Sequence, residues 1–88
     1  MVVFATRGPG PGYRVGITAS RRVGPAVVRN RCRRRVRELA RLWLGGRTAP
    51  VDLVVNVRRG LGEAPWSDLC LEFERCLRSA HRRLGLRW

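Results

Sequence analysis

Residues 20–44 constrain this chain most, because they have the pattern of one helix with two unlike faces. At about 100° per residue, the apolar side chains fall within one arc of roughly 80°. That arc holds Val28, Cys32, Val36, Leu39 and Trp43. A broader arc on the other side carries Arg29, Asn30, Arg33, Arg34, Arg37 and Arg41. One face is therefore expected to pack on a core, and the other to present guanidinium groups.

The basic face is costly for a helix without a partner. Arg29, Arg33, Arg37 and Arg41 are successive like-charge neighbours four residues apart. Each such pair destabilises a helix by about 0.2–0.5 kcal/mol, so the row costs on the order of 1 kcal/mol. A domain of this size has only about 3–5 kcal/mol of stability. The pattern therefore predicts that a polyanion binds across this face.

The composition supports the same class of partner. The 88 residues contain 19 basic side chains, all arginine, against 6 acidic ones, for a net charge of +13. Nucleic acid is the first expectation from such a charge, and an anionic membrane surface the second. The length predicts a single domain, residues 1–88, with a modest core. No apolar run approaches the ~18 residues of a membrane span, and no signal peptide is present, so a cytoplasmic protein is expected.

The rest of the sequence predicts an α+β fold in the order β-β-α-β-α, with the helices packed on one small sheet. Residues 1–6 and 13–19 are β-prone and flank a Gly/Pro turn, which suggests a hairpin. Residues 51–57 form the third expected strand. In the last helix, Ser67 is the expected N-cap and Trp66 is expected to pack on Leu71 as a hydrophobic staple.

Catalysis by the chain itself is not expected. A protein nuclease needs clustered carboxylates for a metal or a histidine pair for acid–base work. The six acids are scattered, and the one histidine, His81, lies at the rim of an apolar stripe. The three cysteines include no CxxC pair and are expected to be buried thiols in a reducing compartment. Trp43 is expected in the core and Trp88 in a disordered end; Arg58 and Arg59 either contact phosphate or lie in a solvated turn.

Residues 21–34, RRVGPAVVRNRCRR, closely resemble the protein subunit of bacterial ribonuclease P. That family carries a basic pair, then Val/Ile-Gly-x-Ala-Val, then Arg-Asn-Arg and a further basic pair at this spacing. Residues 14–20 (RVGITAS) and 52–58 (DLVVNVR) are also similar to the family, so the match extends from about residue 1 to residue 84.

The resemblance implies a mixed sheet with a rare left-handed βαβ crossover. It also implies that the chain binds the catalytic RNA and assists recognition of precursor tRNA, whose 5′ leader the RNA subunit removes with magnesium. No cofactor is expected on the protein alone. The implied RNA-binding residues are Arg21, Arg22, Arg29, Asn30, Arg31, Arg33, Arg34 and Arg37. Asn30 is expected either to bond RNA or to orient a neighbouring arginine.

Family members usually begin with a helix that carries aromatic residues and a short strand, and neither precedes Met1 here. A fragment, a wrongly chosen start codon and a shortened member would all give this sequence. In the family, that helix covers one side of a cleft that holds the leader. Phe4 matches the aromatic residue of the neighbouring strand, although its alternation with core residues fits core packing as well as base stacking.

Three other classes of function share part of this pattern. A general RNA- or ribosome-binding module would have the same charge without a preference for precursor tRNA. A membrane-surface helix would need Phe- and Leu-rich anchors in place of Val, Cys and Val. A helix-turn-helix protein would need a second helix before the basic one, where strands are predicted instead.

Overall fold

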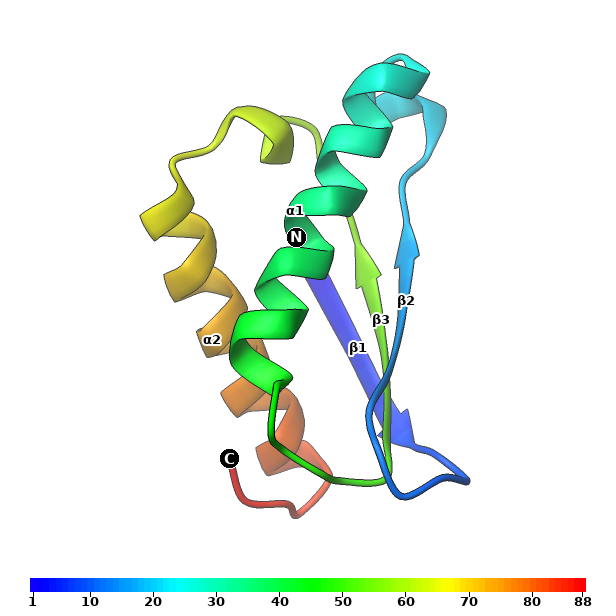
Figure 1. The fold of residues 1–88 in the computed structure, drawn as a ribbon, viewed down its shortest axis with the longest axis vertical. Helices are drawn as coiled ribbons and strands as arrows, with labels where there is room; N and C mark the ends of the chain where they lie inside the picture. The colour runs from blue at the N-terminus through cyan, green and yellow to red at the C-terminus, as the bar shows by residue number, and fades with distance from the viewer.

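The computed structural model describes residues 1–88 and contains two helices on a three-stranded sheet (Figure 1). The elements in chain order are β1 (Val2–Arg7), β2 (Arg14–Thr18), the 3₁₀ turn η1 (Arg21–Val23), α1 (Ala26–Leu44), β3 (Val51–Asn56), the 3₁₀ turn η2 (Leu61–Glu63) and α2 (Trp66–Arg83). The predicted β-β-α-β-α order and the α+β class are confirmed. Neither α1 nor α2 has the length and apolar character of a membrane span.

The predicted hairpin between the first two strands is wrong. The strand order is β1-β3-β2, so β3 lies between them, antiparallel to β1 and parallel to β2. Val54 of β3 is the register partner of Phe4 on one side and of Gly16 on the other. The physical reason lies in β3, whose Val51, Leu53 and Val55 are almost fully buried. Its apolar side chains stabilise the sheet most from the central position, where strands on both sides shield them.

The crossover from β2 through α1 to β3 is left-handed. Both strands point up in Figure 1, while α1 descends on the face of the sheet that carries the helices. Seen with that face toward the viewer, β3 lies to the left of β2. Parallel crossovers are right-handed in about 98% of cases. The chain therefore has the uncommon hand that the resemblance implies.

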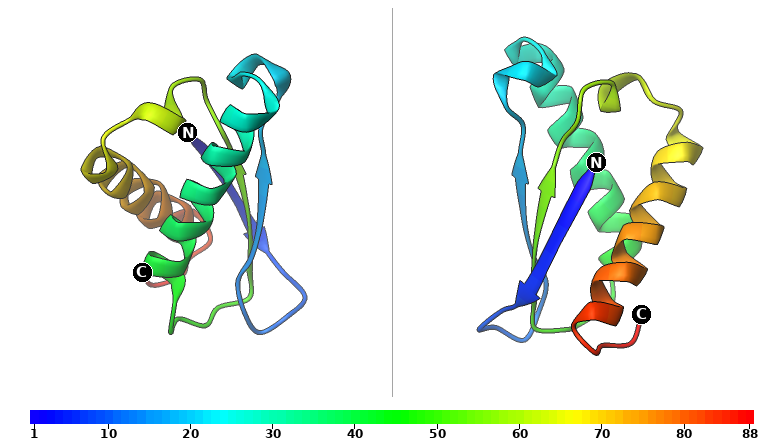
Figure 2. Two further views of the ribbon diagram at one scale, coloured as in Figure 1. Left: turned by 45° about the horizontal axis from the view of Figure 1, so that its top comes forward. Right: turned by 180° about the vertical axis from the view of Figure 1, so that it is seen from behind.

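Both helices cover the same face of the sheet, as the two views of Figure 2 show. The core forms between the helices and the sheet. The residues of α1 in this core are Cys32, Val36 and Leu39, which are fully buried. Val28 in the first turn of α1 and Trp43 in its last turn pack against this core and are partly buried. The other face of the sheet carries no helix or strand of these 88 residues. The two-faced pattern of α1 is thus confirmed.

The start of α2 differs from the prediction. The helix begins at Trp66 with Pro65 in the N-cap position, and Ser67 makes no capping hydrogen bond. Leu71 is 61% exposed, so it is no staple partner for Trp66. Trp66 instead lies beside the guanidinium of Arg35, whose Cζ is 5.6 Å from the ring centroid. A proline at N-cap fixes the backbone entry without a side-chain acceptor, which leaves Trp66 free to turn toward α1.

His81 and Trp88 are more buried than the sequence suggests. His81 is completely buried, with its Nδ1 2.7 Å from the carbonyl oxygen of Leu77 and its Nε2 2.6 Å from the hydroxyl of Tyr13. Because a carbonyl only accepts, Nδ1 donates and the Nε2 of a neutral ring accepts from Tyr13. The ring centroids of Trp88 and His81 are 5.0 Å apart. The Cζ atom of Arg47 lies over the Trp88 ring, 3.9 Å from its centroid. The chain end that was expected to be disordered thus packs against the core through Trp88.

The three cysteines form no disulfide. Cys32 is fully buried, whereas Cys70 and Cys76 are only partly covered. Burial raises the pKa of the Cys76 thiol, so this side chain is held in its neutral form. The expectation of buried thiols therefore holds fully for Cys32 and in part for the other two.

Val36→Asp should unfold the protein, because the new carboxylate would be buried in the core without a partner. Val27→Asp is the matched control, since Val27 lies on the same helix and is 74% exposed. Urea denaturation followed by circular dichroism should show no folded baseline for the first variant and near-parent stability for the second. Equal stability of both variants would contradict the assignment of the two faces of α1.

Tyr13→Phe should lower the free energy of unfolding by about 1–3 kcal/mol, because it leaves the buried Nε2 of His81 without a hydrogen-bond donor. Chemical denaturation at neutral pH measures this. An unchanged midpoint would mean that the Tyr13–His81 hydrogen bond contributes nothing to stability.

Candidate nucleic-acid interface

The predicted RNA-binding residues lie on η1 and on α1. Arg21 and Arg22 are exposed on η1, directly before the start of the helix. Along α1, the exposed members are Asn30, Arg31, Arg34 and Arg37, whereas Arg29 and Arg33 are half-buried. All eight residues thus lie either on η1, at one end of the molecule, or on α1, which follows it (Figure 1).

The row Arg29, Arg33 and Arg37 lies on the side of α1 that faces β2. Arg33 and Arg37 line a cavity of about 260 Å³ together with Val15 and Ile17 of β2. The Nε of Arg29 is buried and has no hydrogen-bond partner. A buried donor without a partner is uncommon in proteins, and a phosphate oxygen is a suitable acceptor for it. This row therefore forms a basic wall along the edge strand of the sheet.

Asn30 orients one arginine of this row. Its Oδ1 accepts a hydrogen bond of 3.2 Å from an Nη of Arg33. Because the amide oxygen is engaged, the Nδ2 group is left to donate to a ligand. An oriented guanidinium binds phosphate with less loss of side-chain entropy than a free one. Of the two roles expected for Asn30, the structure therefore shows the orienting contact.

The other side of α1 has a different role, which the sequence did not reveal. Arg35 belongs to the same arginine run, yet its two Nη groups donate to the carbonyl oxygens of Leu61 and Ala64, at 2.7 and 2.8 Å. These bonds attach the η2 turn to α1. Nothing in an arginine run shows which members are structural, because their partners are backbone atoms distant in the sequence.

A second basic cavity lies where the parallel strands end. It has a volume of about 460 Å³ and is lined by residues that include Thr18, Ser20, Arg33, Asn56 and Arg58. Arg58 therefore belongs with the basic surface, whereas the neighbouring Arg59 donates to the carbonyl oxygen of Arg22, at 3.1 and 3.2 Å, and holds η1 in place. Neither alternative describes Arg59, which bonds to backbone, whereas the cavity beside Arg58 leaves that residue free to contact phosphate.

The start of α1 adds positive potential to the same region. Its first turn contains no acidic residue, and the Pro25 N-cap supplies no side-chain acceptor. The first backbone N–H groups of a helix carry the positive end of the helix dipole. Together with Arg21 and Arg22, they make this end of the molecule attractive to anions.

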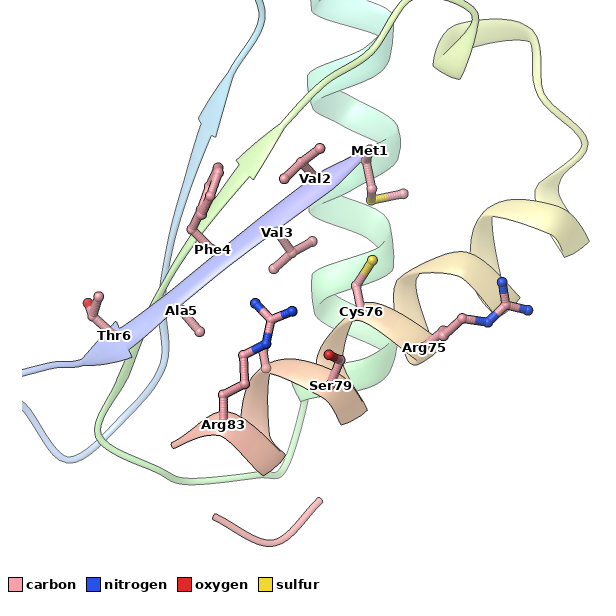
Figure 3. Close-up of a pocket in the computed structure, with 11 residues that line it drawn as sticks. Met1, Val2, Val3, Phe4, Ala5, Thr6, Arg75, Cys76, Ser79 and Arg83 are labelled. Atoms are coloured by element: carbon pink, nitrogen blue, oxygen red, sulfur yellow. The ribbon is translucent and has the colours of Figure 1, made fainter. Parts of the chain in front are cut away.

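The uncovered face of the sheet carries a small apolar platform. Phe4 is 55% exposed and Val54 is 40% exposed, and Gly16 continues the same row without a side chain. The side chains of Phe4 and Thr6 point away from α2 in Figure 3, which shows the groove between β1 and α2. Core packing of Phe4, one of the two sequence-based alternatives, is therefore wrong.

Polar pairs border this platform on both sides. Arg14 donates to both carboxylate oxygens of Asp52, at 2.8 and 2.5 Å, and these bonds lower the pKa of the Asp52 carboxyl. On the other side the Thr18 hydroxyl donates to Oδ1 of Asn56. The alternation of Asp52, Val54 and Asn56 along β3 is the signal by which the sequence could have identified this face.

The acidic side chains are dispersed or paired. Glu38 forms an ion pair of 2.5 Å with Arg41, which lowers the pKa of the Glu38 carboxyl, and Glu74 pairs with Arg78. No group of three or more His, Cys, Asp or Glu side chains is placed to hold a metal ion. What the surface offers a ligand is positive charge, N–H donors and the exposed aromatic rings of Phe4 and Trp66.

Comparisons with known proteins agree with this geometry. The ribonuclease P family model matches residues 1–81. The ribonuclease P protein component of Kocuria rhizophila is 36% identical over 83 residues, which are 94% of this chain and 74% of that protein. That of Chloroflexus aggregans is 47% identical over 70 residues, 78% of this chain and 52% of the relative. This chain thus spans between half and three quarters of the length of these two relatives.

The solved structure of the ribonuclease P protein from Thermotoga maritima superimposes with a TM-score of 0.76 at 26% identity, covering 88% of this chain and 74% of that one. The motif of residues 21–34, placed here on η1 and the exposed side of α1, lies within the region that the family model matches. This chain belongs to the ribonuclease P protein family.

Proposed function

We propose that this chain is the protein component of ribonuclease P, that it binds the catalytic RNA through α1 and η1, and that it assists recognition of precursor tRNA in the cytoplasm. The observation that carries the proposal is the basic wall on α1, where Asn30 orients Arg33 beside a cavity at the sheet edge. Guanidinium groups fixed in this way suit phosphates that follow one another along an RNA strand.

The chemistry belongs to the RNA subunit in this proposal. Three acidic side chains of the protein, Glu38, Asp52 and Glu74, form ion pairs with arginines. Magnesium bound by the RNA would activate the attacking water and stabilise the leaving oxygen. The protein contributes positive charge, which reduces the repulsion between the phosphates of the catalytic RNA and those of the substrate. The net charge of +13 is the source of that effect.

The uncovered face of the sheet supports contact with the 5′ leader. A single-stranded leader presents unstacked bases, and Phe4 beside Val54 offers a ring and an apolar surface at which a base can stack. The hydrogen-bonded pairs at the two ends of the platform supply polar contacts for the leader backbone. A general RNA-binding module is the alternative function, and it would show no preference for precursor over mature tRNA.

Arg29→Ala, Arg33→Ala and Arg37→Ala should each weaken binding of ribonuclease P RNA and reduce the slope of log K against log salt by about one. Arg82→Ala is the matched control, since it removes the same charge from an exposed position on α2. Filter binding at several salt concentrations measures both quantities. If the α1 variants bind as the parent does at every salt concentration, the basic wall is not the RNA site.

Asn30→Ala should weaken RNA binding less than Arg33→Ala, and the double variant should bind about as weakly as Arg33→Ala alone. When two side chains act through one contact, the losses of binding free energy caused by their substitutions do not add. The same binding assay tests this. Additive losses would show that Asn30 contacts RNA independently of Arg33.

The parent chain should restore precursor-tRNA cleavage by the catalytic RNA at low magnesium, where phosphate repulsion is screened least. Phe4→Ala should retain this rescue and lose part of the preference for precursor over mature tRNA, because one base stack contributes about 1–3 kcal/mol. Leu71→Ala, which changes another exposed apolar position on the outer side of α2, serves as the control. Absence of rescue by the parent would refute the ribonuclease P function, whereas an unchanged preference in Phe4→Ala would refute only the leader contact.

A further inference from the structure

A groove lies between α1 and the start of α2, on the opposite side of α1 from the sheet edge. It has a volume of about 500 Å³ and is lined by Arg34, Arg35, Glu38, Leu42 and Trp66. None of these residues lines the cavities beside β2. Leu42 is 50% exposed and Trp66 is 37% exposed, so the groove presents two large apolar side chains to solvent.

Trp66 is held in position from one side. The guanidinium of Arg35 lies over its ring, 5.6 Å from the centroid, and that guanidinium is itself fixed by hydrogen bonds to the carbonyl oxygens of Leu61 and Ala64. Because Arg35 is tied to two backbone atoms, it makes a rigid support for the indole. An exposed aromatic ring that is already ordered loses little entropy when a ligand stacks on it.

The charges around the groove favour an anionic ligand. Arg34 forms no hydrogen bond or ion pair within the chain and is exposed at the groove. Glu38, the acidic residue of the lining, is neutralised by Arg41 through two hydrogen bonds of 2.5 and 3.1 Å. The net charge available to a ligand is therefore positive. An apolar peptide would leave Arg34 without a partner, whereas a nucleotide would satisfy both the ring and the cation.

We propose that this groove binds one unpaired nucleotide of RNA, with its base stacked at Trp66 against Leu42 and its phosphate bound by Arg34. The proposal rests on the proposed function in taking RNA as the partner, and it adds a second contact surface on the side of α1 away from β2. Proteins that bind single-stranded nucleic acid irrespective of sequence combine an aromatic ring, on which a base stacks, with a nearby guanidinium. A base-paired strand would not supply an open base face to the groove.

The test compares Trp66→Leu with Trp66→Phe, which have similar bulk but differ in possessing a ring. The probe is a short single-stranded oligoribonucleotide, and binding is measured by fluorescence anisotropy. Trp66→Leu should bind it on the order of ten-fold more weakly than Trp66→Phe, in line with the contribution of one base stack. The two variants should bind an abasic oligomer of the same length equally. Leu71→Ala, a change at an exposed position on the outer side of α2, should match the parent.

Intrinsic fluorescence gives a second readout. The oligoribonucleotide should quench tryptophan emission of the parent, and Trp66→Phe should lack that part of the quenching. Thermal unfolding verifies that each variant is folded. Equal oligoribonucleotide affinity of the two Trp66 variants, or equal quenching of parent and Trp66→Phe, would overturn the proposal. If these results occur while Arg33→Ala still weakens binding of ribonuclease P RNA, the proposed function stands; if the parent binds no RNA, the proposed function fails instead.

Discussion

Burial of β3 between two strands is the constraint on which the rest of the structure depends. Val51, Leu53 and Val55 face the helices and are almost fully buried, so this strand needs neighbours on both sides and helices above it. Its central place separates β1 from β2 and requires the chain to cross back over the sheet through α1. The crossover then sets one long side of α1 against the edge strand β2. This arrangement places the basic wall of α1 directly beside β2, so that the two elements line one cavity.

The arginines of α1 divide according to what the tertiary structure places beside them. Arg35 bonds to backbone carbonyl oxygens of the η2 region, and Arg41 pairs with Glu38. Arg29, Arg33 and Arg37 have no acidic partner and lie at the sheet edge. Their mutual repulsion is therefore not relieved by any acidic side chain of the molecule. The same run of residues thus holds the fold together at Arg35 and presents unpaired guanidinium groups at the sheet edge.

The three candidate RNA-binding surfaces of the protein differ in chemistry as well as in position. The wall of α1 offers guanidinium groups in series, which suit the continuous backbone of a structured RNA. The platform around Phe4 and the groove at Trp66 each offer one aromatic or apolar surface near an arginine, which suits an unpaired base. A protein with few core residues can present three such surfaces because each uses the exposed side of an element whose other side forms the core.

The sequence by itself determined the elements, the two faces of α1 and the family, because helical and strand periodicities and the motif of residues 21–34 are local properties of the chain. It did not determine that β3 separates β1 from β2, and the hairpin expected from chain proximity was wrong for that reason. It also missed the burial of His81 with Tyr13 and Trp88 and the attachment of Arg35 to η2, and it left the exposure of Phe4 undecided. Each of these depends on contacts between segments far apart in the chain, and only the packing of the whole fold decides such contacts.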